Sequence, residues 1–346
     1  MTLDTILGQL LPQIEADLKD VLRIPHPELA AYYGMMHYHL GWVDESLQPA
    51  AAQGGKRLRP ALCLLACRAA GGDPHWALPA GTAVELVHCF SLVHDDIEDH
   101  SSQRRGRPAM WSVWGVPQAL NAGDGLFVLA RLSLHRLDDR GVPAARRQAA
   151  TVALDQACLA LCEGQFFDMS FESSLDVDLD QYLWMIRHKT ATLLATSAQL
   201  GALVASDDAG LIRGFFRFGE NLGMAFQIQD DILGTWGDEH VTGKSVATDI
   251  RDRKKTLPVV YALHEANDEE AARELAALYA RPERLDRAAS QSALSLLDRV
   301  GARRYAEDTA AEYYRLALAS LDETGIDNQA AADLRELAAR LLKRKQ

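Results

Sequence analysis

Residues 91–108 read SLVHDDIEDHSSQRRGRP, with four acidic side chains in five positions and three arginines just behind them. The apolar residues that lead into the aspartates recur at helical spacing from residue 75 to residue 97, which predicts a long helix. Like charges this close repel one another, so the acidic end is unfavourable unless something positive binds there. The arginines are too few and too far along the chain to neutralise every carboxylate, whereas a metal ion would do so.

Helical spacing continues along almost the whole chain, and alternating strand-like runs with hairpin signals are missing. The breaks are short, apart from GDEHVTGKSVATD at 237–249, and no linker rich in proline, glycine or serine divides the chain. We therefore expect an all-α fold, with residues 1–346 in a single large bundle of long helices. The clearest helical patterns cover residues 3–22, 75–97, 117–137, 143–171, 178–205, 209–233 and 304–321.

The bulk composition excludes several classes of protein. Of the 346 residues 48% are hydrophobic, and the net charge of −12 argues against nucleic acid or an anionic membrane as the main partner. We expect no membrane-spanning segment, and the acidic, amphipathic start is unlike a signal peptide, which favours a cytoplasmic protein. Five cysteines are too few and odd in number for a disulfide framework. Cys63/Cys67 and Cys158/Cys162 have a spacing that could bind zinc, but they lie in apolar stretches and are interpreted as core residues.

The first acidic cluster is suited to a hard metal ion. Asp95 and Asp99 lie one helical turn apart, so their carboxylates share a face. Oxygen ligands without histidine or cysteine suit Mg²⁺, which shares its coordination with water and substrate phosphates. His88 lies on the same face about 10 Å away and could contact an anion. A solvated acidic helix end is the alternative for this motif taken alone.

A second acidic cluster, QDDILG at 229–234, repeats the arrangement. Gln227, Asp230 and Asp231 share a helix face, and the loop that follows is basic. Two such ends in one helical chain predict a clamp in which Mg²⁺ holds a diphosphate. Gly234 stands where a further carboxylate would complete the pattern.

Basic residues before the first cluster are candidates for a second anion contact. In QGGKRLRP, residues 53–60, the proline predicts a helix start, which places Lys56 and Arg59 at a helix N-terminus. The spacing is not that of a Walker A loop, and an exposed basic turn is the alternative.

A lone charge also interrupts an apolar helical pattern at Lys189–Thr190. Lysine is rarely buried without a partner, so this pair is a candidate site. Gln165 and Asp168 are one turn apart and face either the same cavity or solvent.

Seven motifs follow one another in register over roughly residues 30–260: GGKRLRP, ELVHCFSLVHDDIED, RRGRP, EGQFFD, KT, FQIQDD and TGK. Their order resembles the trans-isoprenyl diphosphate synthase (polyprenyl synthetase) family, in particular its short-chain farnesyl and geranylgeranyl diphosphate synthases. The resemblance implies a type I isoprenoid synthase fold, with long helices around a central cavity, and a homodimer. It also implies two aspartate-rich motifs that face each other across the cavity mouth and bind about three Mg²⁺ ions with an allylic diphosphate.

The resemblance further implies roles for individual residues. The metal ligands are expected to be Asp95, Asp96, Asp99, Asp230 and Asp231. The allylic diphosphate is expected to meet Arg104, Lys189, Lys244 and Lys254, and isopentenyl diphosphate to meet Lys56, Arg59, His88 and Arg105. Gln165, Asp168, Thr190 and Gln227 are expected to line the reacting centre. Gly234 departs from the family pattern, but Asp230 is the position expected to bind metal directly.

The implied reaction joins isopentenyl diphosphate to dimethylallyl, geranyl or farnesyl diphosphate. Mg²⁺ and basic residues stabilise charge as the allylic C–O bond breaks, and the isopentenyl double bond attacks the carbocation. Thr190 and Gln227 can turn partial negative charge towards the cation. A proton then leaves to the released diphosphate, so no strong general base is needed. Catalysis is expected to depend on Lys189, Thr190, Gln227, Asp95 and Asp230.

Product length is expected to depend on the residues just before Asp95. Phe90 lies five positions before it and the small Ser91 four before it. In the family, aromatic residues at both positions go with the fifteen-carbon product, whereas one at the earlier position alone resembles synthases of the twenty-carbon product. We therefore expect geranylgeranyl diphosphate, with farnesyl diphosphate as the next candidate.

Three other classes of protein remain as alternatives. A terpene cyclase would share the helices and the metal, but would not need a second anion site. A non-catalytic partner subunit usually has a damaged aspartate motif, and this first motif is complete. A di-iron carboxylate bundle needs two E-x-x-H motifs, and only Glu85–His88 spells one.

Overall fold

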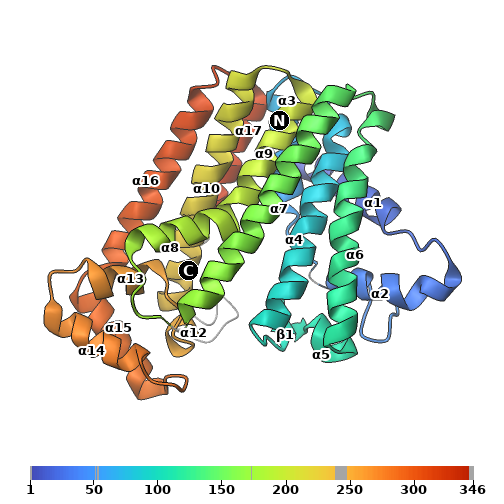
Figure 1. The fold of residues 1–346 in the computed structure, drawn as a ribbon. Helices are drawn as coiled ribbons and strands as arrows, with labels where there is room; N and C mark the ends of the chain where they lie inside the picture. The colour runs from blue at the N-terminus through green and yellow to red at the C-terminus, as the bar shows by residue number, and fades with distance from the viewer. Residues whose placement is uncertain (1, 51, 53, 173, 238–247, 343–346) are drawn as a thin grey trace. The chain divides into compact units, whose positions relative to one another are not determined.

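The computed structural model describes residues 2–50, 52, 54–172, 174–237 and 248–342. Nearly all regular structure in these residues is helical, so the all-α prediction is confirmed (Figure 1). One antiparallel hairpin joins the two-residue strands β1 (Gln103–Arg104) and β2 (Arg107–Pro108). The sequence pattern does not predict this hairpin, because strands of two residues are too short to show alternation.

The chain divides into two compact units that interleave in sequence. The first unit comprises Met1–Cys158, Thr196–Phe215 and Ile326–Leu334, and the second Leu159–Ala195, Phe216–Gly325 and Arg335–Gln346. The expectation of a single domain stays a prediction.

In the first unit, α4 is largely buried among its neighbours. It packs against α1, α3 and α6, and Figure 1 shows α4 and α6 side by side. Leu86 and Val87 at its centre are fully buried. The helices are α1 (Leu3–Val21), η1 (Pro27–Leu29), α2 (Ala30–His39), α3 (Leu58–Ala69), η2 (Pro74–Ala77), α4 (Leu78–Glu98), α5 (Met110–Trp114), α6 (Val116–His135), η3 (Asp138–Arg140) and the start of α7 (Ala144–Glu172).

A buried carboxylate joins three of these elements. Asp17 of α1 accepts a hydrogen bond of 2.6 Å from the Thr82 hydroxyl of α4. Arg136, at the end of α6, donates to both oxygens of Asp17, at 2.8 and 3.0 Å. A buried charge needs such partners, so this network fixes α4 relative to its neighbours.

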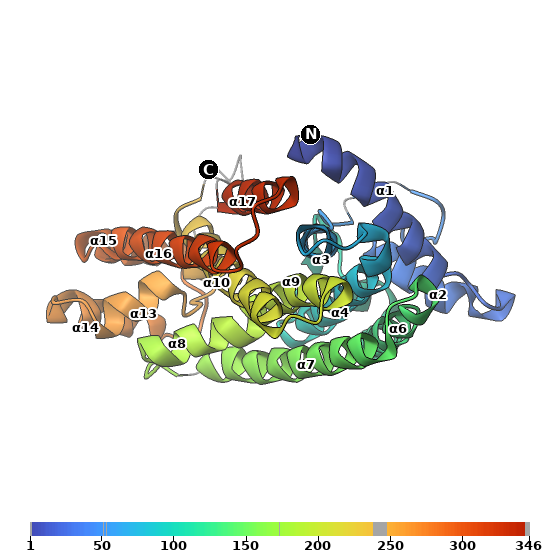
Figure 2. The ribbon, with the colours of Figure 1, turned by 90° about the horizontal axis from the view of Figure 1, so that it is seen from above.

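In the second unit, α13 lies at the centre of the packing. It contacts α8, α14 and α16, and α15 contacts α16 (Figure 2). One hydrophobic cluster contains Met185, Ile228 and Leu257, and a second contains Leu275 and Leu297. The helices are the end of α7, α8 (Leu179–Ile186), η4 (Arg187–Ala191), α9 (Thr192–Ala205), α10 (Ala209–Trp236), α12 (Thr248–Arg251), α13 (Leu257–His264), α14 (Glu269–Tyr279), α15 (Arg287–Arg299), α16 (Ala302–Asp322) and α17 (Gln329–Leu342), with α9, α10 and α17 partly in the first unit.

The helical pattern predicted over 178–205 is interrupted in the structure. Residues Arg187–Ala191 form a π-helical turn between α8 and α9. Such turns insert an extra residue into a helix and are frequent at functional sites. The interruption carries Lys189 and Thr190, which the apolar periodicity on either side had placed in one continuous helix.

One apolar helix among the described residues is long enough to cross a membrane. It is the run Pro74–Glu98, formed by η2 and α4, and 72% of its most apolar stretch is buried inside the fold. A core helix passes the same test of length and composition.

Candidate active site

The first acidic motif lies in the last turn of α4. Asp99 caps the helix, and its backbone N–H donates to the carbonyl of Asp95 at 2.8 Å. The two residues are therefore one turn apart, as predicted. A helix C-terminus carries partial negative charge. The carboxylates there are therefore repelled both by one another and by the helix end, and a bound cation is favoured. Asp95 and Asp99 are both half-buried.

Asp96 has a different environment from its neighbours. It is 1% exposed, and Arg104 of β1 donates to its Oδ1 from Nε at 2.8 Å and from Nη2 at 2.5 Å. Burial raises the pKa of the Asp96 carboxyl, and the hydrogen bonds and charge of Arg104 oppose that rise. Asp96 thus anchors the hairpin to the end of α4, while Asp95 and Asp99 remain better placed to bind a metal.

The hairpin turn separates two adjacent arginines. Arg105 and Gly106 both have positive φ, 54° and 74°, as the two central residues of a tight type I′ turn require. Arg105 bears a side chain in the left-handed region, an uncommon and strained conformation. Its Nη1 donates to the carbonyl of Gly54 at 2.6 Å, whereas Arg104 points to Asp96. The prediction that the two arginines serve different phosphates stays a prediction.

Arg57 organises the loop before α3, a role that the sequence motifs do not predict. It has φ of 48° and is buried. Its guanidinium donates to Glu15 at 2.6 Å, to Glu85 of α4 at 2.9 Å, and to the carbonyls of Gly54 and Leu40. Glu85 is thus committed to an ion pair. Arg57 and Arg105 share the carbonyl of Gly54, so the loop and the hairpin are fixed together.

The cationic residues predicted for isopentenyl diphosphate lie around this loop. Arg59 is in the first turn of α3, and its Nε is buried with no hydrogen-bond partner among the described residues. Burial lowers the pKa of Arg59 to about 10, with Arg105 adding to the effect and Glu85 opposing it. Burial, followed by the charges of Arg59 and Arg105, lowers the pKa of His88, which is therefore neutral at neutral pH. Lys56 is exposed.

This set of residues is electrostatically suited to an anion. Arg59 and Arg105 make no ion pair with a carboxylate in the part of the chain that the structure describes. Partly desolvated positive charges that repel one another are stabilised by a bound dianion.

The second acidic motif, on α10 in the second unit, divides in the same way. Asp230 is exposed, whereas Asp231 is buried. Asp231 accepts hydrogen bonds from the Tyr182 hydroxyl, the Leu257 backbone N–H at 2.9 Å and the Gln227 amide at 3.0 Å. Burial raises the pKa of Asp231 to about 7 in spite of these bonds. Asp231 is thus held as a structural anchor, and the prediction that it binds metal stays a prediction.

A third carboxylate comes close to the gap left by Gly234. A Cβ built on Gly234 would lie 1.7 Å from Oδ2 of Asp249, in α12. The Asp249 carboxylate therefore occupies the space of a side chain at position 234. Sequence reasoning missed Asp249, because no pattern relates it to position 234, 15 residues earlier in the sequence.

Lys189 and Thr190 lie in the π-helical turn between two glycines. A Cβ on Gly164 of α7 would be 2.3 Å from the Lys189 backbone N, and one on Gly223 of α10 would be 2.5 Å from Cα of Ala191. Both positions must be glycine for α7 and α10 to approach the π-helical turn this closely. Lys189 donates to Asp168 at 2.5 Å.

A hydrogen-bond chain connects the turn to the second acidic motif. The Thr190 hydroxyl donates to Gln227 Oε1 at 2.8 Å, and the Gln227 amide donates to Asp231. The hydroxyl oxygen of Thr190 thus keeps its lone pairs, which is the orientation needed beside a positive charge. Three predicted site residues are brought together here.

Of the remaining predicted residues, Gln165 is half-buried on α7, and Lys254 is exposed after α12. Lys244 lies outside the described residues. Among the described residues no three histidine, cysteine, aspartate or glutamate side chains converge on a preformed metal site. Mg²⁺ commonly takes one or two carboxylates and completes its shell with water and phosphate, so the paired carboxylates fit it.

The residues predicted to set product length lie on α4. The Phe90 ring packs against Phe127 of α6, with centroids 5.2 Å apart, and against His94. Ser91 donates its hydroxyl hydrogen to the carbonyl of His88 at 2.9 Å. Phe90 thus contributes to packing between α4 and α6.

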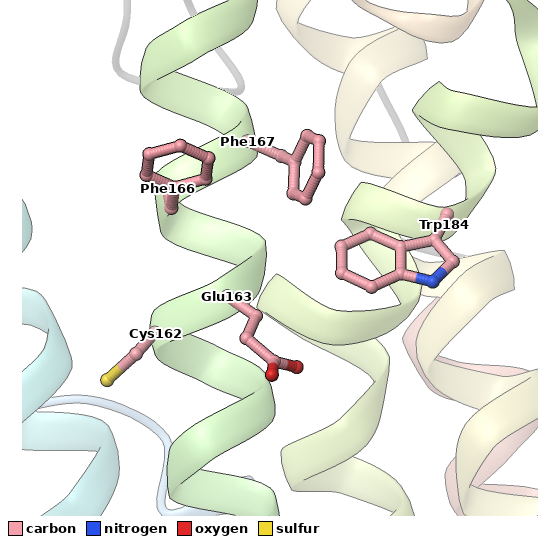
Figure 3. A pocket seen from close by; sticks show the side chains of 5 residues that line it. All are labelled: Cys162, Glu163, Phe166, Phe167 and Trp184. Atoms are coloured by element: carbon pink, nitrogen blue, oxygen red, sulfur yellow. The ribbon is translucent and has the colours of Figure 1, made fainter.

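An aromatic pocket lies between α7 and α8 in the second unit (Figure 3). Phe167 and Trp184 project towards each other from the two helices, with centroids 4.9 Å apart. Cys162, expected in the core, is exposed and lines this pocket, whereas Cys63, Cys67 and Cys158 are buried as expected. None of the predicted site residues lines it.

The polyprenyl synthetase family model matches residues 41–297. A geranylgeranyl diphosphate synthase of Mycobacterium tuberculosis is 45% identical over 291 residues, which cover 84% of this chain and 81% of the relative. A (2E,6E)-farnesyl diphosphate synthase of the same species is 41% identical over 312 residues, 88% of this chain and 84% of the relative. The crystal structure of geranylgeranyl pyrophosphate synthetase from Pyrococcus horikoshii matches with a TM-score of 0.87 at 32% identity, over 99% of this chain and 98% of that one.

Proposed function

The chain belongs to the polyprenyl synthetase family, and from this premise we propose that it is a trans-prenyltransferase that condenses isopentenyl diphosphate with an allylic diphosphate. Its farnesyl and geranylgeranyl diphosphate synthase relatives support an all-trans, short-chain product. The proposal rests on the cluster around Arg59 and Arg105, since neither of these two arginines pairs with a carboxylate among the described residues. An enzyme that binds one diphosphate, such as a terpene cyclase, has no use for a second cationic site.

The family is generally Mg²⁺-dependent, and the donor set of this chain fits that ion. Asp95 and Asp99 would hold Mg²⁺ at the end of α4. Asp230 of α10 and Asp249 of α12 would hold it at the second acidic motif, with about three ions in all. When bound, Mg²⁺ supplies the positive charge that stabilises the leaving diphosphate.

The residues around the π-helical turn would act at the allylic carbon. Lys189 would move from Asp168 to the diphosphate, assisted by Arg104, Lys244 and Lys254. Thr190 directs its oxygen lone pairs at the developing cation, because its hydrogen is donated to Gln227. Fixed dipoles of this kind stabilise a transition state without reorganising.

The second anion site would hold isopentenyl diphosphate. Arg59 and Arg105 supply fixed charge, Lys56 supplies a mobile one, and neutral His88 supplies a hydrogen bond. Holding both reactants in one orientation converts a bimolecular encounter into an effectively unimolecular step. The proton lost after attack goes to the released diphosphate.

We expect geranylgeranyl diphosphate as the main product, with farnesyl diphosphate as the next candidate, since Ser91 leaves room that an aromatic residue would fill. Homodimer formation is supported by exposed apolar residues at intervals of four or eight on α6. These are Val116, Leu120, Val128 and Leu132. Sedimentation would test the dimer.

The experiment that tests the function is incubation of the purified protein with labelled isopentenyl diphosphate, dimethylallyl diphosphate and Mg²⁺. A linear prenyl diphosphate is expected, identified by chromatography of the dephosphorylated alcohol. A cyclic hydrocarbon would instead indicate a cyclase, and no product would indicate a non-catalytic subunit.

A further inference from the structure

His39, the last residue of α2, has a buried polar atom that the proposed mechanism does not use. The residue is 8% exposed, and its Nε2 has no hydrogen-bond partner within the described ranges. Buried polar atoms are nearly always hydrogen-bonded, so an exception calls for a partner that the protein alone does not supply. A ligand in the adjacent site would be such a partner.

The backbone on both sides of His39 is fixed by arginines. Arg107 of β2 donates to the carbonyl of Tyr38 at 3.3 Å, and its guanidinium lies 3.9 Å from the centre of the Tyr38 ring. Arg57 donates to the carbonyl of Leu40 at 3.2 Å. The end of α2 is thus tied both to the hairpin and to the loop before α3.

These are the two segments that carry the second anion site. Arg105 in the hairpin turn donates to Gly54 in the loop, and Gly54 also packs against Leu40, since a Cβ on it would lie 1.8 Å from the Leu40 carbonyl oxygen. His39 is therefore fixed at the junction of the segments that carry Lys56, Arg59 and Arg105.

The electrostatics make His39 a neutral hydrogen-bond donor. Burial lowers its pKa well below the usual value, and the charges of Arg105, Arg104, Arg57 and Arg107 add to the effect. It also lies close enough to His88 to lower that residue's pKa. A neutral imidazole carries one N–H, and with the hydrogen on Nε2 it can donate to an anion without adding to the repulsion among the arginines.

We propose that His39 is a further substrate-contact residue, whose Nε2–H donates a hydrogen bond to a phosphate oxygen of isopentenyl diphosphate. The inference rests on the proposed function, because it places His39 in the second of the two diphosphate sites. No sequence motif marks this histidine, which lies outside the GGKRLRP and ELVHCF segments.

The test compares His39→Leu, which removes the donor, with His39→Gln, which keeps an N–H at a similar distance. His37→Leu is the matched control, because His37 is on the same helix and its Nε2 already has a partner, the carbonyl of Leu22 at 2.9 Å. KM for each substrate, kcat and the melting temperature are measured for all four proteins.

We expect His39→Leu to raise KM for isopentenyl diphosphate about 10- to 100-fold, the loss expected for one hydrogen bond to a charged group. The KM for dimethylallyl diphosphate should change less than about twofold, and His39→Gln should recover most of the loss. His37→Leu should leave both KM values near those of the wild type.

A second measurement covers the case in which His39→Leu does not fold. In wild-type protein labelled with ¹⁵N-histidine, isopentenyl diphosphate without Mg²⁺ should shift the Nε2 resonance that is absent from His39→Gln. No shift, or equal changes in both KM values, would overturn the assignment of His39. A wild-type protein that makes no prenyl product would overturn the proposed function, which is a distinguishable result.

Discussion

Replacing Gly234 by alanine separates the stability of α10 from the geometry of its acidic end. The new Cβ would lie 1.7 Å from Oδ2 of Asp249, and contacts under 3.0 Å are essentially never seen, so the carboxylate must move by at least 1.3 Å. Asp249 reaches this point with the end of a flexible side chain, so the movement itself is inexpensive. Alanine is also favoured over glycine inside a helix by about 0.5–1 kcal/mol.

The consequence for activity has the opposite sign. A displacement of about 1 Å in an active-site group can cost about 100-fold in rate. We therefore expect Gly234→Ala to lower kcat about 100-fold at saturating substrates and Mg²⁺, while its free energy of unfolding is unchanged or higher. Both quantities are measured on the same preparation, by product formation and by urea denaturation.

Gly8→Ala is the matched control, because Gly8 lies inside α1 and a Cβ there would meet nothing within 4 Å. It should gain stability with kcat unchanged. The reasoning would be refuted by a Gly234→Ala protein that keeps kcat within about twofold of the wild type. That result would mean that the Asp249 carboxylate has no part in the reaction.

The remaining predictions concern the first unit. Asp95→Ala should lower kcat at least 100-fold, because it removes a metal-bound charge in the transition state, and a loss under tenfold would mean that the metal site is elsewhere. Arg104→Ala should raise KM mainly for the allylic substrate and Arg105→Ala mainly for isopentenyl diphosphate, since the two side chains point to different partners; equal effects on both substrates would contradict this. Ser91→Phe should shorten the product and Phe90→Ala lengthen it, as read from the chain length of the alcohols. Unchanged product lengths in both variants would mean that other residues limit the length of the product.

Much of the fold follows from periodicity alone. The patterns over 75–97, 117–137 and 143–171 correspond to η2 with α4, to α6 and to α7, each within a few residues. Because one face of a helix is buried, apolar residues recur at every third or fourth position. Long helices can therefore be recognised from the sequence alone. The π-helical turn is not visible in this way, because one extra residue hardly disturbs an apolar stretch on either side of it.

Site residues that stand close together in the sequence could be predicted, whereas contacts between residues far apart in the sequence could not. Asp95 and Asp99, or Asp230 and Asp231, stand together in the sequence. Asp96 contacts Arg104, 8 positions away, and Asp231 contacts Tyr182, 49 positions away. The distinction between these two buried, anchored aspartates and the more accessible ones beside them therefore required the structure.

Arg57, Asp249 and His39 were missed for the same reason. Arg57 stands inside a motif but faces Glu15 and Glu85 instead of the substrate, a distinction set by its left-handed backbone. Asp249 approaches Gly234 from 15 positions along the sequence, and Tyr38, next to His39, accepts a hydrogen bond from Arg107, 69 positions away.

The proposed enzyme has two diphosphate sites, of which only one uses the acidic helix ends. Titration calorimetry with and without Mg²⁺ tests this arrangement most directly, using isopentenyl diphosphate in one arm and a non-hydrolysable thio-analogue of dimethylallyl diphosphate in the other. Isopentenyl diphosphate is expected to bind with a similar Kd in both conditions, because Arg59 and Arg105 hold it, whereas the allylic analogue is expected to bind only with Mg²⁺. A single site, or isopentenyl diphosphate binding that is lost without Mg²⁺, would contradict this arrangement.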